Sequence, residues 1–376
     1  MRIDVKSEML QWAIKRAGFD EHELVIKSPD LGKWLSGERK PTVKQLQKFA
    51  KKVYLPFGYL LLSEPPQEHL PIPFFRTQKK QAKKTTDLNV YDTILMLQQR
   101  QDWLREYLIE NEFAALPFVG RFQNQEHIDE SKVVDDIRQT LNLSQDWASE
   151  FSSWSEALAH LVNQIEDHRI IVVFNGVVGN NTHRKIAVEA CRGFVLVDEM
   201  APFMFINNAD AKAAQMFTIV HELAHIWLGY SAGFDFRLMR PADDPLEKMC
   251  DGIAAEFLVP SKAFGIFWKK SQSIERAARH FKVSEIVIAR RALDTGKINR
   301  RQFSDFYYTY IHKERNRKKS QGGNFYATTR KRLSPTFGAH IYHAVTSGQL
   351  LYRDAYKLTG LKGNTFQTFF STYLGE

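Results

Sequence analysis

The chain has 376 residues, of which 44% are hydrophobic, and a formal net charge of +9. This length and composition suffice for packed cores in two or three domains and argue against a disordered chain. No stretch approaches the roughly 18 apolar residues of a membrane span, and the first residues lack the apolar core of a signal peptide, so we expect neither a membrane protein nor a secreted one. The two cysteines, Cys191 and Cys250, are too few for a disulfide framework, which favours the reducing cytoplasm.

Residues 1–62 predict a compact helical domain. Apolar residues recur at helical spacing from Met9 to Ala17, and Gly18 is placed to close that helix. Thr42 is placed to cap a second helix, whose apolar face runs from Val43 to Val53.

The segment between these two helices, Lys33-Trp34-Leu35-Ser36-Gly37 and Pro41-Thr42, resembles the XRE-type helix-turn-helix. The resemblance implies contact with double-stranded DNA, and the basic charge of the chain permits it. Four basic side chains could meet phosphates, namely Lys33, Arg39, Lys40 and Lys44. Residues His22–Lys27 lack the Gln-x-x-Leu-Ala element typical of such domains. A DNA-binding domain and a protein-contacting module therefore both remain open.

Residues 63–87 predict a linker, because four prolines between Pro65 and Pro73 favour an extended path and four lysines between Lys79 and Lys84 add charge. Its aromatic segment Phe74–Thr77 is predicted to dock on a neighbouring domain.

Residues 88–312 predict a mostly helical α+β domain. Helical stretches run from Leu88 to about Glu112, from Val133 to Leu143 and from Trp154 to Ile165. Short β-branched or aromatic segments then predict three strands of a small sheet: Ile170–Phe174, Gly193–Val197 and Pro202–Ile206. Phe203–Asn207 is the candidate edge strand for an extended peptide, the alternative being a strand paired on both sides.

The sequence His221-Glu222-Leu223-Ala224-His225 carries the most specific signal in the chain. Two histidines four residues apart lie on one face of a helix, so both imidazoles can reach one zinc ion, and Glu222 between them can act as a base toward water at the open position. A helix is expected here, with Asn208 as its N-cap and Gly229 as its C-cap.

A third ligand is expected from a second helix, which Pro245 opens and Pro260 stops. Glu247 is the preferred ligand, and the competing carboxylates are Asp243, Asp244 and Glu256. Asp251 lies one turn beyond Glu247, where its carboxylate can accept the second N–H of a ligating histidine and fix the tautomer.

These motifs, together with Cys250-Asp251, Ala254-Ala255 and Phe257-Leu258-x-Pro260, resemble the ImmA/IrrE zinc metallo-endopeptidases of bacteria. The resemblance covers about the middle half of the chain and implies a zincin-like metallopeptidase domain. It implies that His221, His225 and Glu247 hold Zn²⁺ and that Glu222 is the base. It also implies a protein substrate, such as a repressor or an antitoxin-like partner.

Two later segments add expectations. Ile274–Arg291 reads as helix, turn and helix and is interpreted as structural, while its basic side chains His280, Arg290 and Arg291 are candidates for stabilising an oxyanion. Residues 313–376 predict a basic loop, Lys313–Gly323, followed by a helical appendage.

The leading hypothesis is a zinc-dependent endopeptidase of the bacterial cytoplasm that cleaves a regulatory protein. The alternative is a DNA-binding transcriptional regulator or toxin–antitoxin component whose zinc site is sensory or vestigial. Because a site that only binds metal needs no base, Glu222 favours the enzyme.

Overall fold

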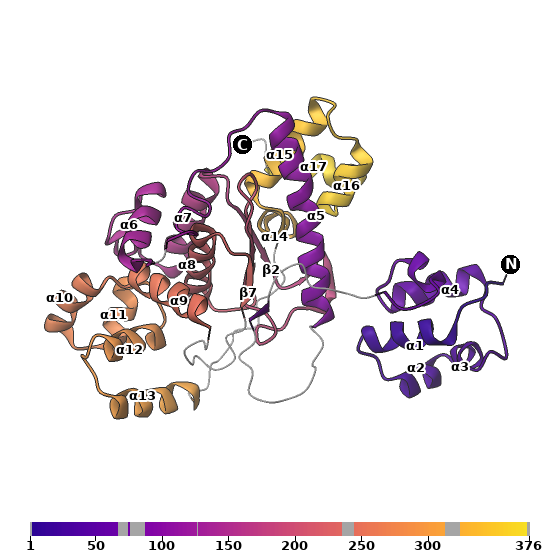
Figure 1. Ribbon diagram of the computed structural model, residues 1–376, viewed down its shortest axis with the longest axis horizontal. Coiled ribbons are helices and arrows are strands. Elements are labelled where there is room, and N and C mark those ends of the chain that lie inside the picture. Colours follow the sequence, from indigo (N-terminus) through magenta and orange to yellow (C-terminus); the bar gives the residue numbers. More distant parts are fainter. Residues whose placement is uncertain are drawn as a thin grey trace. The chain divides into compact units, whose positions relative to one another are not determined.

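A computed structural model describes residues 2–66, 74–75, 87–125, 127–234, 244–312 and 324–373. The chain divides into two compact units, Met1–Leu70 with Thr85–Tyr91 and Pro71–Lys84 with Asp92–Glu376 (Figure 1). Most of the predicted linker, including Lys79–Lys84, and the whole basic loop Lys313–Gly323 lie outside the described residues.

The N-terminal unit is a small helical bundle around Leu10, Ile14, Trp34 and Leu46. Thr42 forms a capping box with Gln45, accepting its N–H at 3.3 Å while the Gln45 side chain accepts the Thr42 N–H at 2.9 Å, so the predicted cap is confirmed. Its elements are α1 Ser7–Arg16, α2 Glu21–Lys27, α3 Pro29–Leu35, α4 Val43–Lys52 and the 3₁₀ turn η1 Phe57–Leu61.

A mixed five-stranded sheet organises the second unit, in the order β1-β7-β5-β6-β2. β6 runs parallel to β2 and antiparallel to β5, and β5 is also antiparallel to β7. The strands are β1 Phe74–Phe75, β2 Ile171–Asn175, β5 Gly193–Leu196, β6 Phe203–Asn207 and β7 Ala232–Phe234, and a separate hairpin joins β3 Val177–Val178 to β4 Asn181–Lys185.

Helices cover both faces of this sheet, which explains why the side chains of β2, β5 and β6 are almost all apolar and buried. Val172, Val195 and Met204 belong to the core beneath the helices α7 and α8. On the other face, Phe203 meets the ring of Phe337 edge to face. In Figure 1 the two helical layers lie on either side of the strands.

The remaining helices follow in chain order and lie in the second unit, except for the first residues of α5, up to Tyr91, which belong to the N-terminal unit. They are α5 Leu88–Glu110, α6 Glu130–Thr140, η2 Trp147–Glu150, α7 Trp154–Asp167, α8 Lys212–Leu228, α9 Pro245–Leu258, α10 Ser261–Ser271, α11 Ile274–Phe281, α12 Glu285–Asp294, α13 Arg300–His312, α14 Phe325–Leu333, α15 Pro335–Thr346, α16 Tyr352–Thr359 and α17 Gly363–Tyr373. None of the helices in the described part of the chain is long and apolar enough to span a membrane. The predicted mostly helical α+β class is confirmed for these residues.

Two local predictions were wrong. β6 is paired on both sides, so Phe203–Asn207 is an interior strand and not the sheet edge. The helix of the histidine motif begins at Lys212 after the N-cap residue Ala211, so Asn208 does not cap it. Asn208 instead follows β6 directly, with its backbone N–H bonded to the Asn175 carbonyl. Pairing at the strand end therefore outcompetes the capping preference of this residue.

Candidate metal centre

Helix α8 lies in the core of the second unit and is buried on every side from Met216 to Leu228 except at Phe217. Such burial requires apolar residues all round, and the stretch supplies them apart from Thr218 and the histidine motif. Gly229 ends the helix in the left-handed conformation, at φ 79°, and its N–H bonds to the His225 carbonyl, as the sequence predicted.

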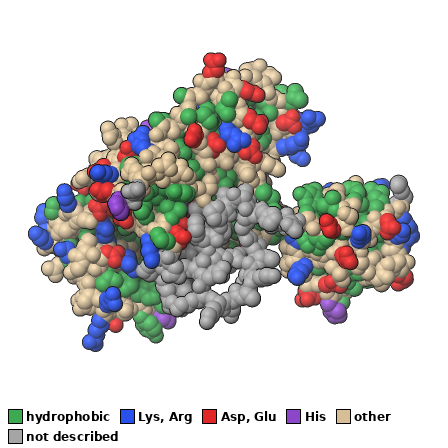
Figure 2. Space-filling view, in the orientation of Figure 1, with side chains coloured by type: hydrophobic (Ala, Val, Ile, Leu, Met, Phe, Trp, Pro, Cys, Tyr) green, Lys and Arg blue, Asp and Glu red, His purple; other side chains and the backbone are tan. Residues whose placement is uncertain are grey.

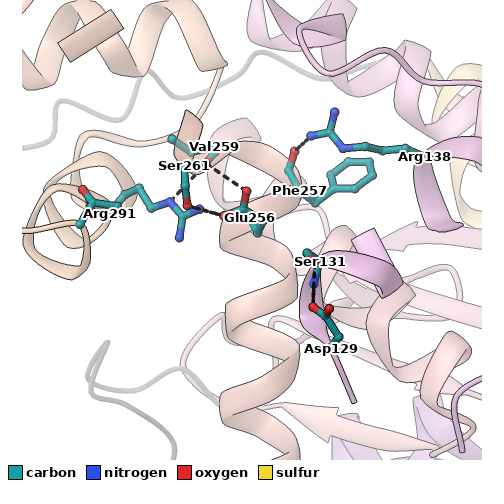
Figure 3. A network of polar contacts seen from close by, with 9 residues as sticks. Asp129, Ser131, Arg138, Glu256, Phe257, Val259, Ser261 and Arg291 are labelled. Carbon is teal, nitrogen blue, oxygen red and sulfur yellow. Dashed lines mark hydrogen bonds and ion pairs between the residues drawn. The ribbon is translucent and has the colours of Figure 1, made fainter. Parts of the chain in front are cut away.

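Helix α9 packs beside α8 and is held at both ends. At its start, Asp244 accepts the backbone N–H of Leu246 at 2.8 Å. At its end, the guanidinium of Arg138 donates to the Phe257 carbonyl and that of Arg291 to the Val259 carbonyl (Figure 3). These donors satisfy carbonyls that a helix end leaves without partners, and they fix the helix that carries Glu247 and Asp251.

Three side chains of types that bind metal ions converge where α8 and α9 meet. The Nε2 atoms of His221 and His225 lie 3.2 Å apart, and the Glu247 carboxylate lies 3.2 Å from the first and 3.3 Å from the second. Ligand atoms in a tetrahedral zinc site, with bonds of about 2.0–2.1 Å, lie about 3.3 Å apart. The spacing therefore fits three ligands of one zinc ion.

The burial of these three groups also indicates a metal site. His221 and His225 are 0% exposed and Glu247 is 1% exposed. Neither oxygen of Glu247 has a hydrogen bond of good geometry with a described residue, although two imidazoles are close. Buried carboxylates without partners are costly and rare, and carboxylate and imidazole groups aimed at a common point suit a bound cation.

Asp251 occupies the position predicted for an outer carboxylate. Its Oδ1 lies 3.0 Å from Nδ1 of His221, on the side of the ring away from Glu247. Such a contact has the imidazole donate from Nδ1 and leaves Nε2 free to bind a metal.

Glu222 lies beside this group, is 0% exposed, and neither carboxylate oxygen has a hydrogen-bond partner in the described chain. It is close to strand β5, because a Cβ added to Gly193 would lie 3.2 Å from its Oε1 and 2.5 Å from Thr218 Cγ2. Only glycine permits this approach of α8 to the sheet, a constraint that the sequence analysis did not identify.

The protonation of the cluster follows from burial and mutual contacts. Burial raises the pKa of Glu222 to about 8, with Glu247 adding to the rise. Burial acts to lower the pKa of His221, but contacts with Asp251 and Glu247 outweigh it and raise this pKa to about 10. Burial acts to raise the pKa of Glu247, but contacts with the two histidines outweigh it and lower this pKa to about 2. Burial lowers the pKa of His225. Glu247 is therefore ionised at neutral pH, as a metal ligand must be, whereas His221 must release its Nε2 proton when a metal binds.

Cys250 is a competing ligand that the sequence analysis did not consider. Its Sγ lies within 4.8 Å of ligand atoms of His221 and His225. Burial raises the pKa of this thiol well above its ordinary value, however, whereas a metal binds the thiolate. The closer and ionised Glu247 is therefore the better third ligand.

The other candidates lie elsewhere. Asp244 caps α9 and Glu256 pairs with Arg291, while Asp243 lies outside the described residues. Of the candidates for an oxyanion, Arg290 pairs with Asp294 at 3.0 Å and Arg291 is held at the end of α9. The ring of His280 stacks on Phe267 at 4.6 Å. None of these three basic groups is directed at the histidines by any described contact.

The basic residues predicted for DNA lie on the surface of the N-terminal unit. Arg39 pairs with Asp30 at 3.4 Å and Lys40 with Asp4 at 2.8 Å. Lys33 and Lys44 are exposed and form no ion pair with a described residue. On the face of this unit seen in Figure 2, blue basic side chains alternate with red acidic ones. α2 and α3 are joined by Ser28 alone, a shorter turn than the three or four residues typical of a helix-turn-helix.

Comparison with known families gives two matches. Residues 166–293 match the family model Peptidase_M78, described as the IrrE N-terminal-like domain. This range includes α8 and α9 and supports a metallopeptidase-type domain similar to that of the ImmA/IrrE family. Residues 333–372 match DUF8813, a domain of unknown function that corresponds to the C-terminal helices. No curated protein and no solved structure matched the chain.

Proposed function

We propose that this chain is a zinc-dependent endopeptidase that cleaves a regulatory protein, such as a repressor or an antitoxin-like partner. The observation that carries the proposal is the buried Glu222 carboxylate, which has no described partner and lies next to three converging metal-ligand groups. Such an arrangement is unfavourable in a core that serves only for packing, because each buried charge costs free energy. The similarity to the IrrE N-terminal-like domain supports the same proposal.

In the proposed reaction, His221, His225 and Glu247 hold the zinc ion. Zinc, when bound, supplies positive charge that polarises the scissile carbonyl and promotes deprotonation of water. Asp251 keeps His221 in the tautomer with Nε2 free. Glu222 accepts a proton from the attacking water and passes it to the leaving amine.

Burial helps Glu222 in both steps. Its pKa is raised to about 8, and a nearby cation acts in the opposite direction because it favours the carboxylate. Burial favours the protonated form that gives the proton to the leaving amine, and the cation favours the carboxylate that accepts it from water.

We place this activity in the bacterial cytoplasm. The chain has only two cysteines, too few for a disulfide framework, which supports this compartment. A second function, binding of double-stranded DNA by the N-terminal unit, is supported by the exposed Lys33 and Lys44 and would bring the peptidase to a regulator at its operator.

The decisive experiment is Glu222→Gln, which removes the base and keeps the size of the side chain. Zinc content and fold should persist, while cleavage should fall by about 10²–10⁴-fold. A partner protein shortened in cells that express the wild type should stay intact with the variant and co-purify with it. If Glu222→Gln keeps the full biological effect and His221→Ala loses it, the metal has a sensory or structural role and the peptidase proposal is wrong.

A further inference from the structure

A cavity of about 570 Å³ adjoins the metal centre on the side of Asp251. Its walls come from α8, α9 and α12, with contributions from α6, α13 and the residue before β5. Its apolar lining includes Phe217, Ala255, Ile286, Val287 and Phe303. The volume lies in the range of ligand sites, and this lining is not explained by the zinc ligands or by Glu222.

The cavity reaches the reacting groups through two residues. Asp251 lines it and contacts His221 at 3.0 Å. Thr218 also lines it and precedes Glu222 by four residues, a rise of about 6 Å along the helix. A side chain bound in the cavity would therefore lie close to the metal centre, within about one helix turn of Glu222.

The charged residues of the lining are largely neutralised within the protein. Arg290 pairs with Asp294 at 3.0 Å, and Arg291 pairs with Glu256 (Figure 3). Arg192 pairs with Asp210 at 3.4 Å. Because these guanidinium groups already have carboxylate partners, an acidic side chain in the cavity could bind one of them only by breaking an existing ion pair. Glu130 and Lys248 also line the cavity, but both are exposed and their charges are opposite in sign. The apolar lining is therefore what selects the occupant.

We infer that this cavity is the specificity subsite for a large apolar side chain, such as leucine or phenylalanine, flanking the scissile bond of a protein substrate. The inference rests on the proposed peptidase function and names the substrate feature that the enzyme recognises. α12 supplies Ile286 and Val287 to the wall, so the second helix of the predicted helix-turn-helix segment acts as part of the substrate site.

The test is to fill the cavity with Val287→Trp in the full-length, zinc-loaded protein. Val287 is only partly buried and borders the cavity, so the added bulk has room. The matched control is Ile266→Trp on α10, where the side chain is 62% exposed and does not line the cavity. Zinc content and circular dichroism should match wild type for both variants.

Cleavage sites in a defined peptide mixture are mapped by mass spectrometry. The wild type and Ile266→Trp should prefer leucine or phenylalanine over alanine next to the cut by about 10- to 200-fold, the range for differences in hydrophobic contact. Val287→Trp should reduce or reverse this preference. A second measurement avoids turnover: a leucine peptide should bind Glu222→Gln more tightly than an otherwise identical alanine peptide by calorimetry, and adding Val287→Trp should abolish the difference.

The outcomes separate the two proposals. If the wild type cleaves peptides but Val287→Trp leaves the preference and the binding difference unchanged, the cavity is not the subsite and the peptidase function stands. If the zinc-loaded wild type cleaves nothing and Glu222→Gln behaves identically, the peptidase function is wrong, and the subsite inference is overturned with it.

Discussion

The metal centre and the N-terminal unit both gather ionisable side chains, but they do so in opposite environments. At the metal centre, two histidines and two glutamates are at most 1% exposed, and several of their polar atoms have no described partner. In the N-terminal unit, Arg39 and Lys40 are about half exposed and each has an acidic partner nearby. Water screens the second set, so its charges cost little and carry little information. The buried charges of the first set cost free energy, and groups with such perturbed pKa values indicate a functional site.

The largest expected effect concerns the ligands themselves. The purified wild type should contain about one zinc per chain, and His221→Ala, His225→Ala or Glu247→Ala should lose most of it, because only two protein ligands remain. Elemental analysis after dialysis against a weak chelator measures the loss.

Matched controls are Glu256→Ala and Cys250→Ser. Glu256 is on the same helix but pairs with Arg291, and Cys250 is a neutral thiol close to the histidines. Both variants should keep zinc. If Cys250→Ser loses the metal and Glu247→Ala retains it, the third ligand is the cysteine.

Sequence analysis found the residues of this centre because the chemistry depends on local spacing. His221, Glu222 and His225 lie on one helix, and Glu247 and Asp251 on the next, so helical periodicity places each group on its face. Cys250 was missed because its approach to the histidines depends on how the two helices cross. The contact of Gly193 with α8 and the cavity beside α12 also depend on residues far apart in the chain.

The fold, too, was predicted where it depends on local sequence and missed where it depends on long-range pairing. The predicted strands at Ile170–Phe174, Gly193–Val197 and Pro202–Ile206 each correspond to an observed strand within one residue at either end. Their order in the sheet did not follow from the sequence, because β5 and β7 are set side by side only by long-range pairing. The hairpin β3–β4 was also missed, although Gly179-Asn180 is a two-residue turn signal.

A partly buried histidine outside the metal centre tests the effect of burial on stability. Burial, with the charge of Arg169, lowers the pKa of His340 to about 4. In the unfolded chain the pKa of this histidine is near 6.5. The contribution of the neutral His340 to the free energy of unfolding is therefore complete above about pH 6.5 and is lost as pH falls toward 4. The loss is on the order of 3 kcal/mol at most.

The measurement compares urea midpoints of wild type and His340→Gln between pH 7 and pH 4.5. The variant loses ring contacts with Tyr107 and Phe113 at every pH, but its midpoint should fall less steeply on acidification. His183→Gln, at an exposed position, should follow the wild-type slope. Parallel curves for wild type and His340→Gln would show that His340 is not protected from protonation.

The smallest expected effect is on DNA binding by the N-terminal unit. If Lys33 and Lys44 contact phosphates, the intact chain should bind duplex DNA with an affinity that falls as salt rises, and removing either lysine should reduce the slope of log K against log salt by about 0.9. Arg39→Ala and Lys40→Ala should change the slope less, because each cation must first leave its partner, Asp30 or Asp4. Fluorescence anisotropy at several salt concentrations measures these slopes, and the effect should be the same for unrelated sequences, since phosphate contacts do not read bases. Equal slopes for all four variants and the wild type would assign the unit to protein contacts, and the contrast with the metal centre would then be one between a reactive site and a surface without nucleic-acid function.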